Sequence, residues 1–244
     1  MHRLDVPRSE EGLEVMVPTW FTDLSWAAIG LAVACALWIA GDQWIRGHRQ
    51  QMGIMEAVWP VTALYYGPVA VWGYRRFGLP KSPQWRNEHG YDEPPERPGW
   101  SSVATGVSHC GAGCTLGDLC AEWAVFGFGA TIIGLSLLPE YIGDYILALA
   151  FGIAFQYFAI APMRGLGLRK GLVEAAKADV LSLTSFEVGL FGWMALMQFV
   201  FFPHHVHPDH AAFWFLMQVG MIVGYFTAWP TNVWLIRKGI KEAM

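Results

Sequence analysis

The chain has 244 residues, of which 54% are hydrophobic and only 15% are charged, and its mean hydropathy is +0.33. Soluble domains usually carry about a quarter charged residues, and a soluble fold of this length has too little interior to cover so much apolar surface. The composition therefore excludes an ordinary soluble domain and predicts an integral membrane protein, whereas the net charge of −4 says little about partners. We expect the lipid bilayer as the main partner, and no nucleic acid.

The first 18 residues are expected to form a short cytoplasmic N-terminal arm (1–18). They are mixed and acidic, and they lack the basic start and the short apolar run of a secretion signal. The first apolar stretch is long enough to stay in the membrane as an anchor rather than to be cleaved.

Six apolar stretches approach the roughly 20 residues that an α-helix needs to cross a bilayer. They run at about 20–40, 54–74, 116–138, 141–162, 181–202 and 212–235. The sequence therefore predicts an all-α, polytopic membrane helical bundle in which residues 19–244 form a single six-helix transmembrane domain. A proline-rich polar segment at about 75–102 is expected to be an extended cytoplasmic loop of this domain.

Lys and Arg are distributed unevenly over the loops that six spans would produce. The arm, the second and fourth loops and the C-terminal end carry all of them except Arg46 and Arg49. Because basic loops are retained on the cytoplasmic side, both termini are expected in the cytoplasm, in a multi-pass protein of a bacterial inner (plasma) membrane.

Candidate metal ligands are concentrated at the predicted start of the third span, in a Gly-rich run at 109–118 and just after it. They are His109, Cys110, Cys114, Asp118 and Glu122. If the helix begins near Cys114, then Cys114, Asp118 and Glu122 recur every four residues and share one face. A helix N-terminus favours the thiolate form, and thiolate with imidazole suits copper(I) or zinc. The alternative is tight helix packing through small residues.

A second group of candidate ligands lies in the short loop before the last span, which six spans would place outside. It consists of His204, His205, His207 and His210. Neutral imidazoles bind Cu(II) and zinc, although a solvated polar turn would have the same composition. Within the spans, Glu187 and Gln156 need an explanation, because a carboxylate inside a membrane suggests a functional site unless helix-to-helix hydrogen bonds satisfy it.

The run His-Cys-Gly-Ala-Gly-Cys-Thr-Leu-Gly-Asp at 109–118 resembles the signature of a bacterial family of integral membrane proteins of unknown function. Ser-Leu-Thr-Ser-Phe-Glu-Val-Gly at 182–189 and Trp-Pro-Thr-Asn-Val-Trp-Leu-Ile-Arg-Lys-Gly-Ile-Lys at 229–241 are similar to the same family. The resemblance covers about 50–244 and supplies no activity, but it draws attention to 109–118, Glu187 and Asn232.

These features favour a membrane metal-handling protein that transports or stores a transition metal ion, copper first and zinc second. Thiols at the cytoplasmic entrance and imidazoles in the outer loop would be the two ends of a path. Three other functions stay open. They are an accessory subunit of a larger membrane complex such as a respiratory or metal-dependent oxidase, a membrane thiol redox protein using Cys110 and Cys114, and a solute channel, because Gly-rich re-entrant segments line filters. Association with itself or with other membrane subunits fits each of them.

Overall fold

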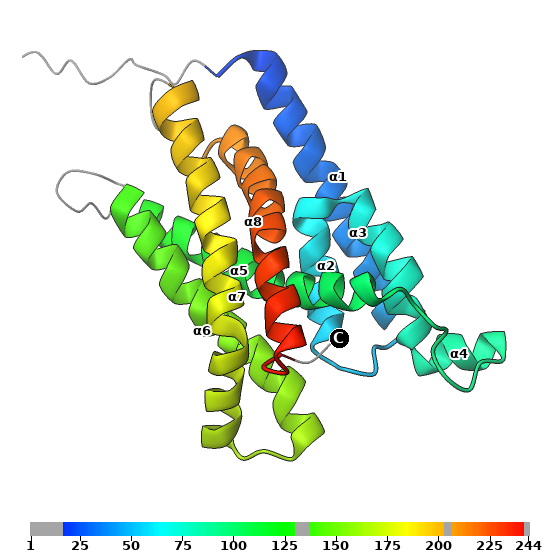
Figure 1. The fold of residues 1–244 in the computed structure, drawn as a ribbon. Coiled ribbons are helices and arrows are strands. Elements are labelled where there is room, and N and C mark those ends of the chain that lie inside the picture. Colours follow the sequence, from blue (N-terminus) through cyan, green and yellow to red (C-terminus); the bar gives the residue numbers. More distant parts are fainter. Residues whose placement is uncertain (1–16, 130–136, 203–205, 242–244) are drawn as a thin grey trace, which may run out of the picture.

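The computed structural model describes residues 17–129, 137–202 and 206–241, and this part of the chain is all-α, as expected. Figure 1 shows the helices as a single bundle. Its elements are α1 (Thr19–Trp44), α2 (Met55–Tyr66), α3 (Pro68–Gly73), η1 (Tyr74–Gly78), η2 (Leu79–Lys81), α4 (Pro83–His89), α5 (Gly99–Phe128), α6 (Leu137–Arg164), α7 (Leu168–Leu196), η3 (Met197–Phe201) and α8 (Ala211–Arg237).

Four segments of the described chain are long and apolar enough to cross a membrane: α1, most of α6, α7 with η3, and α8. They match the stretches predicted at 20–40, 141–162, 181–202 and 212–235. The count of six spans is not confirmed. The stretch predicted at 54–74 has a different structure, and the described part of the stretch predicted at 116–138 belongs to α5, which already begins at Gly99.

The stretch at 54–74 is a helical hairpin rather than one span. Helix α2 has 12 residues and rises only about 18 Å. The chain then reverses at Gly67, whose φ of 51° favours glycine, and Pro68 begins α3. Near the reversal, the backbone carbonyl of Leu64 accepts a hydrogen bond of 2.7 Å from the Gln218 side chain of α8. The hairpin returns to the end of the bundle from which it started (Figure 1).

The segment at 75–102 is not an extended loop either. It contains η1, η2 and α4, and α5 already begins at Gly99. Helix α4 is attached to the bundle through the loop after α1: the Gln84 side chain donates to the Arg46 carbonyl at 3.1 Å, and the His48 ring lies 3.0 Å from Asp42 and 3.3 Å from Glu88. Hydrogen bonds from Gln84 and His48 lower the pKa of Glu88.

Helix α5 is 30 residues long and crosses the middle of the bundle obliquely (Figure 1). Its small residues bring α5 and α6 into backbone contact, because a Cβ on Gly113 would lie 2.8 Å from the Gly152 Cα. Close approach through small residues is a usual way to pack helices in a membrane. The glycines therefore fix the distance between α5 and α6, and they do not end the helix.

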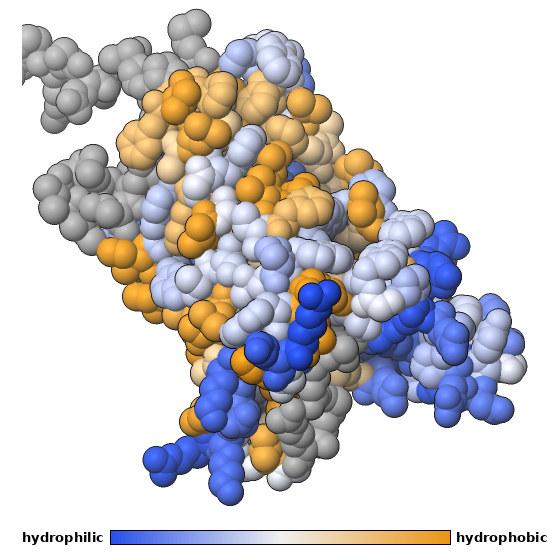
Figure 2. Space-filling view, in the orientation of Figure 1, coloured by the Kyte–Doolittle hydropathy of each residue, from blue (hydrophilic) through white to orange (hydrophobic). Residues whose placement is uncertain are grey.

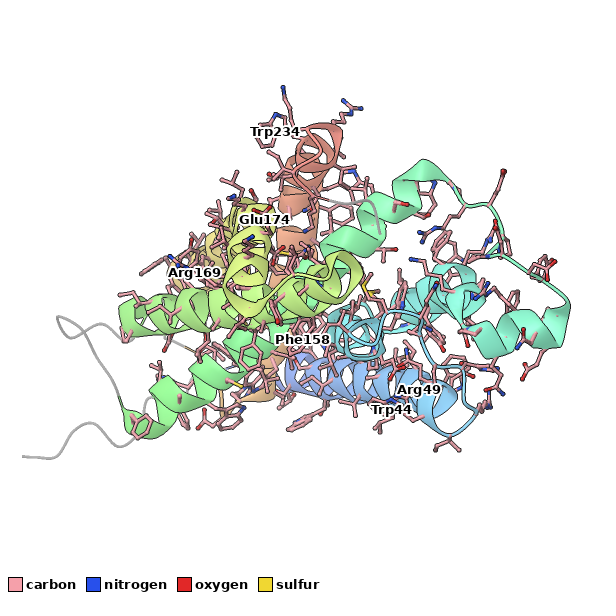
Figure 3. All side chains as sticks on the ribbon, turned by 90° about the horizontal axis from the view of Figure 1, so that it is seen from below. Trp44, Arg49, Phe158, Arg169, Glu174 and Trp234 are labelled. Atoms are coloured by element: carbon pink, nitrogen blue, oxygen red, sulfur yellow. The ribbon has the colours of Figure 1, made fainter. Side chains whose placement is uncertain are left out.

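The bundle has one basic end. The start of α1 and the end of α8 lie at opposite ends of the bundle (Figure 1). The space-filling view shows hydrophilic residues gathered at the lower end, below an apolar body (Figure 2). Seen from below, Arg49 and Arg169 lie at this end (Figure 3). The segments that Figure 1 draws toward this end are the loop after α1, α4 with the loop that follows it, the start of α7 and the end of α8. Their other basic residues include Arg46, Arg86, Arg97, Lys170, Arg237 and Lys238.

Candidate functional site

Four carboxyl side chains meet in the interior between α5, α6 and α7, and we call them the carboxyl cluster. They are Asp118 and Glu122 of α5, Asp144 of α6 and Glu187 of α7. All are at most 2% exposed. Asp118 and Asp144 each interact electrostatically with Glu187 and Glu122, and the Glu122 and Asp144 side chains are in direct contact.

The carboxyl cluster has more oxygens than hydrogen-bond donors. Both oxygens of Asp118 and both of Glu187 are buried without a hydrogen-bond partner among the described residues, as is one oxygen each of Glu122 and Asp144. A buried ionised carboxylate without a partner costs several kcal/mol, so this arrangement is stable only with protons or a cation in it.

Two thiols lie beside the carboxyl cluster. Cys114 is fully buried and has Cys110, Glu187 and Asp118 as its electrostatic neighbours. Cys110, Cys114, Asp118 and Glu122 therefore share the buried face of α5, with Glu187 added from α7. The expected position at a helix start is wrong, because α5 begins ten residues before His109 and the motif lies in mid-helix. The thiols consequently receive no help from a helix N-terminus.

A second buried polar group, which we call the lysine cluster, lies nearer the basic end. It comprises His109 (α5), Asp179 and Ser182 (α7), Asn232 (α8) and Lys241 after α8. The buried Gln156 of α6 is one turn from Gly152, which packs against Asp179. The Lys241 ammonium donates to Asp179 at 3.1 Å and to Ser182 at 3.4 Å, and the Asn232 amide donates to Ser182 at 2.7 Å. Both ring nitrogens of His109 and both amide atoms of Gln156 have no hydrogen-bond partner within the described chain.

The two clusters are continuous along α5. His109 belongs to the lysine cluster, Cys110 and Cys114 follow on the next turns, and Asp118 and Glu122 complete the carboxyl cluster. From His109 to Glu122, an α-helix rises about 20 Å along its own axis. Because α5 runs obliquely, the bundle contains a continuous buried polar path along α5 that crosses the bundle interior rather than following its long axis (Figure 1).

The two described histidines of the loop before α8 have contacts with residues outside both clusters. His204 and His205 lie outside the described residues, and the His207 ring lies against Phe126. His210 has a structural contact at the start of α8, where its Nδ1 accepts a hydrogen bond of 3.1 Å from the Ala212 amide. For His210, helix capping therefore explains the contact that the structure shows.

Three residues of the two clusters were not singled out from the sequence. Asp144, in the stretch predicted at 141–162, is 1% exposed. Asp179 lies in a segment for which no span is predicted, and Lys241 is one of the basic residues of the C-terminal end. The spacing of Asp179 and Ser182 along α7 was a usable signal, because residues three apart lie on the same side of a helix.

No group of three or more His, Cys, Asp and Glu side chains in the described parts of the chain is placed closely enough to hold a metal ion. The thiols, imidazole and carboxylates are metal ligands in kind, since each is a common donor to transition metals.

The chain belongs to a family described as "Domain of unknown function (DUF4396)", whose model matches residues 99–241. The matched region begins at the first residue of α5 and ends at Lys241, so it contains every member of both clusters. Neither the curated proteins nor the solved structures give a match.

Proposed function

We propose that this member of the DUF4396 family carries a transition metal ion through the membrane along the polar path of α5, α6 and α7. One observation carries the proposal: four buried carboxyls, two of which neighbour Cys114, form one cluster with oxygens that lack hydrogen-bond partners in the described chain. Intramembrane carboxylates are costly, and they mark ion and proton pathways.

Charge balance explains why such a cluster would handle a cation. Carboxylates in contact, such as Glu122 and Asp144, cannot all be ionised in a low-dielectric interior. The empty cluster therefore holds protons, and an entering cation releases them. Metal movement in one direction would then be coupled to proton movement in the other.

The donor atoms narrow the choice of ion. Cys110 and Cys114 supply soft sulfur, which favours copper(I) and zinc, whereas the carboxyl oxygens of Asp118 and Glu187 also accept harder divalent ions. Copper is the first ion to test because the thiols lie beside the centre of the carboxyl cluster, and zinc is the second.

The basic end of the bundle fits the cytoplasmic side of a bacterial inner membrane. Arg46 and Arg49 were exceptions to the charge rule in a six-span topology, but the hairpin of α2 and α3 places their loop at the same end as the other basic loops. Helix α1 then begins on the outer side and α8 ends in the cytoplasm. This proposal replaces the expectation that both termini are cytoplasmic.

Metal uptake by the purified protein in liposomes tests the function. Vesicles containing a metal-sensitive dye are supplied outside with Cu(I) or Zn²⁺, and the initial rate is compared between wild type, Glu187→Gln and Glu174→Gln. Both glutamates are on α7, but Glu187 is 1% exposed in the carboxyl cluster, whereas Glu174 is on the surface beside Lys177. We expect uptake to fall about tenfold or more in Glu187→Gln, since mutating a buried ion ligand removes at least that much affinity.

Equal rates for Glu187→Gln and Glu174→Gln, at equal protein content and melting temperature, would contradict a path through the carboxyl cluster. If wild-type liposomes take up neither ion, the metal assignment fails. An accessory role in a larger membrane complex would then become the leading explanation, and co-purification of other subunits from native membranes would support it.

A further inference from the structure

The Lys241 side chain is completely buried although it follows the last helix. Helix α8 ends at Arg237, Gly239 turns the chain with a φ of +69°, and the amides of Ile240 and Lys241 donate back to the Leu235 carbonyl. The exposed residues of this turn include Lys238, whereas Lys241 points inward. Lysine is almost never fully buried unless its charge is paired, so the insertion of this ammonium needs a reason.

The surroundings of Lys241 contain more acceptor atoms than its ammonium uses. It donates to one oxygen of Asp179 and to the Ser182 hydroxyl. The second oxygen of Asp179 and the amide oxygen of Asn232 are buried and have no hydrogen-bond partner in the described chain. A buried acceptor left unpaired costs about 1–3 kcal/mol, so a plain structural ion pair would leave this cost unexplained.

The same place is the inner end of the polar path. His109 interacts electrostatically with both Asp179 and Lys241, and it precedes Cys110 on α5. Gly152 of α6 lies against the free oxygen of Asp179, since a Cβ there would be 3.0 Å from it, and Gln156 is one turn farther along. Helices α5, α7 and α8 therefore contribute to the lysine cluster and α6 packs against it, between the carboxyl cluster and the basic end.

We propose that Asp179, Ser182 and Asn232 form a second cation site at the inner mouth of the path, and that the tethered ammonium of Lys241 occupies and closes it. This inference rests on the proposed function, because the inorganic cation that replaces the ammonium is the transported metal ion. When the C-terminal turn withdraws, a carboxylate, a hydroxyl and an amide oxygen become free for that ion. A positive charge remains at the site in both states, so Asp179 is never left unpaired.

Labelling of the path thiols tests the closed mouth without relying on transport. In a Cys35→Ser/Cys120→Ser background, a membrane-impermeant maleimide is added from the basic side, and modification of Cys110 and Cys114 is followed by mass spectrometry. We expect Lys241→Met to speed modification by about tenfold, since losing one buried charge contact shifts a local opening equilibrium by that order. Lys238→Met, which changes the exposed lysine of the same turn, should leave the rate unchanged, and Lys241→Arg should restore slow labelling.

A second measurement uses the unaltered protein, so it does not depend on how a variant folds. Lysine acetylation is compared with and without Zn²⁺ or Cu(I). Lys238 should react at once in every condition, and Lys241 should react only as the metal displaces it.

The proposal that Lys241 closes the inner mouth is wrong if a folded Lys241→Met protein shows unchanged thiol labelling. It is also wrong if Lys241 stays protected from acetylation whether or not metal is present. Metal uptake that still depends on Glu187 would in that case leave the proposed function standing. Fast labelling in Lys241→Met without any metal uptake would support the mouth and overturn the metal assignment instead.

Discussion

Gly113 of α5 lies against Gly152 of α6 so closely that a Cβ on Gly113 would come within 2.8 Å of the Gly152 Cα. This contact holds the two helices that carry most of the carboxyl cluster at backbone distance. It makes the glycine-rich motif a packing device as well as a neighbour of the candidate site.

Gly113→Ala is therefore expected to destabilise the protein, because an added methyl group must push α5 and α6 apart. Overpacking of this kind costs about 1–3 kcal/mol, which exceeds the gain of roughly 0.5–1 kcal/mol from replacing a mid-helix glycine. Gly106→Ala is the matched control, since Gly106 is in the same helix and has nothing within 4 Å of an added Cβ. Melting in detergent should be lower for Gly113→Ala and equal or higher for Gly106→Ala. The reverse order would contradict the packing of α5 on α6.

Cys114→Ser should change the preference among metals more than it changes stability. Serine replaces a soft sulfur with a hard oxygen at nearly the same volume, so copper(I) binding should weaken by about tenfold or more while harder divalent ions are less affected. Cys120→Ser provides the control, because Cys120 is an exposed thiol of the same helix. Competition titrations with a chromogenic chelator give the two affinities. Equal copper(I) affinity in both variants would remove Cys114 from the site.

His210→Ala should weaken the start of α8 and leave metal uptake intact. The His210 ring accepts the Ala212 amide hydrogen bond, and losing a helix cap costs about 0.5–2 kcal/mol. His210→Asn, which retains a capping acceptor, should recover most of that stability. If uptake falls in His210→Ala at unchanged stability, the outer histidines take part in metal handling after all.

The ends of the bundle can be assigned to the two sides of the membrane by labelling single introduced cysteines. Thr19→Cys, at the start of α1, should react with an impermeant maleimide from the outside of intact cells. Lys238→Cys, after α8, should react only after the membrane is opened. Both are tested with Cys35 and Cys120 replaced by Ser. Reaction of both positions from the same side would restore the expectation that the termini share one compartment.

The attachment of α4 should depend on the charge of Glu88. Its folded pKa is lowered by Gln84 and His48, so ionised Glu88 stabilises the docked helix above its unfolded pKa of about 4.3. That stabilisation is lost as pH falls through the folded pKa, and not near neutrality. Hydrogen exchange at residues 83–89, corrected for intrinsic rates, should rise in this acidic window in wild type. In Glu88→Gln, hydrogen exchange at these residues should no longer rise in the acidic window. A rise near pH 7 in wild type would mean that another group controls the attachment of α4.

The sequence identified the all-α class and the four apolar helices because long hydrophobic runs are a strong local signal. It did not separate a hairpin from a span at 54–74, since both are apolar and of similar length, and the Gly67-Pro68 pair was the only local sign of a reversal. It also placed the start of α5 too late, because the segment 99–113 is rich in small and polar residues that make contacts only inside a bundle.

For the candidate site too, single residues could be predicted from the sequence, but their contacts could not. The motif around Cys114 and the lone Glu187 could be identified one at a time, but their meeting depends on how α5 and α7 cross. Asp179 and Lys241 are 62 residues apart, and no local pattern predicts a C-terminal lysine folded back into the interior. Long-range pairing of this kind is a property of the packed bundle.

The hairpin of α2 and α3 has a consequence for biosynthesis. Its tip lies at membrane depth, and the Leu64 carbonyl near that tip is satisfied by Gln218, which the ribosome supplies only when α8 is made. A backbone carbonyl without a hydrogen-bond partner is unfavourable in lipid, so the hairpin is less stable in the membrane before α8 is present. The hairpin is therefore expected to complete its packing only after α8 has been made, and a chain that stops before α8 would leave the Leu64 carbonyl without this partner.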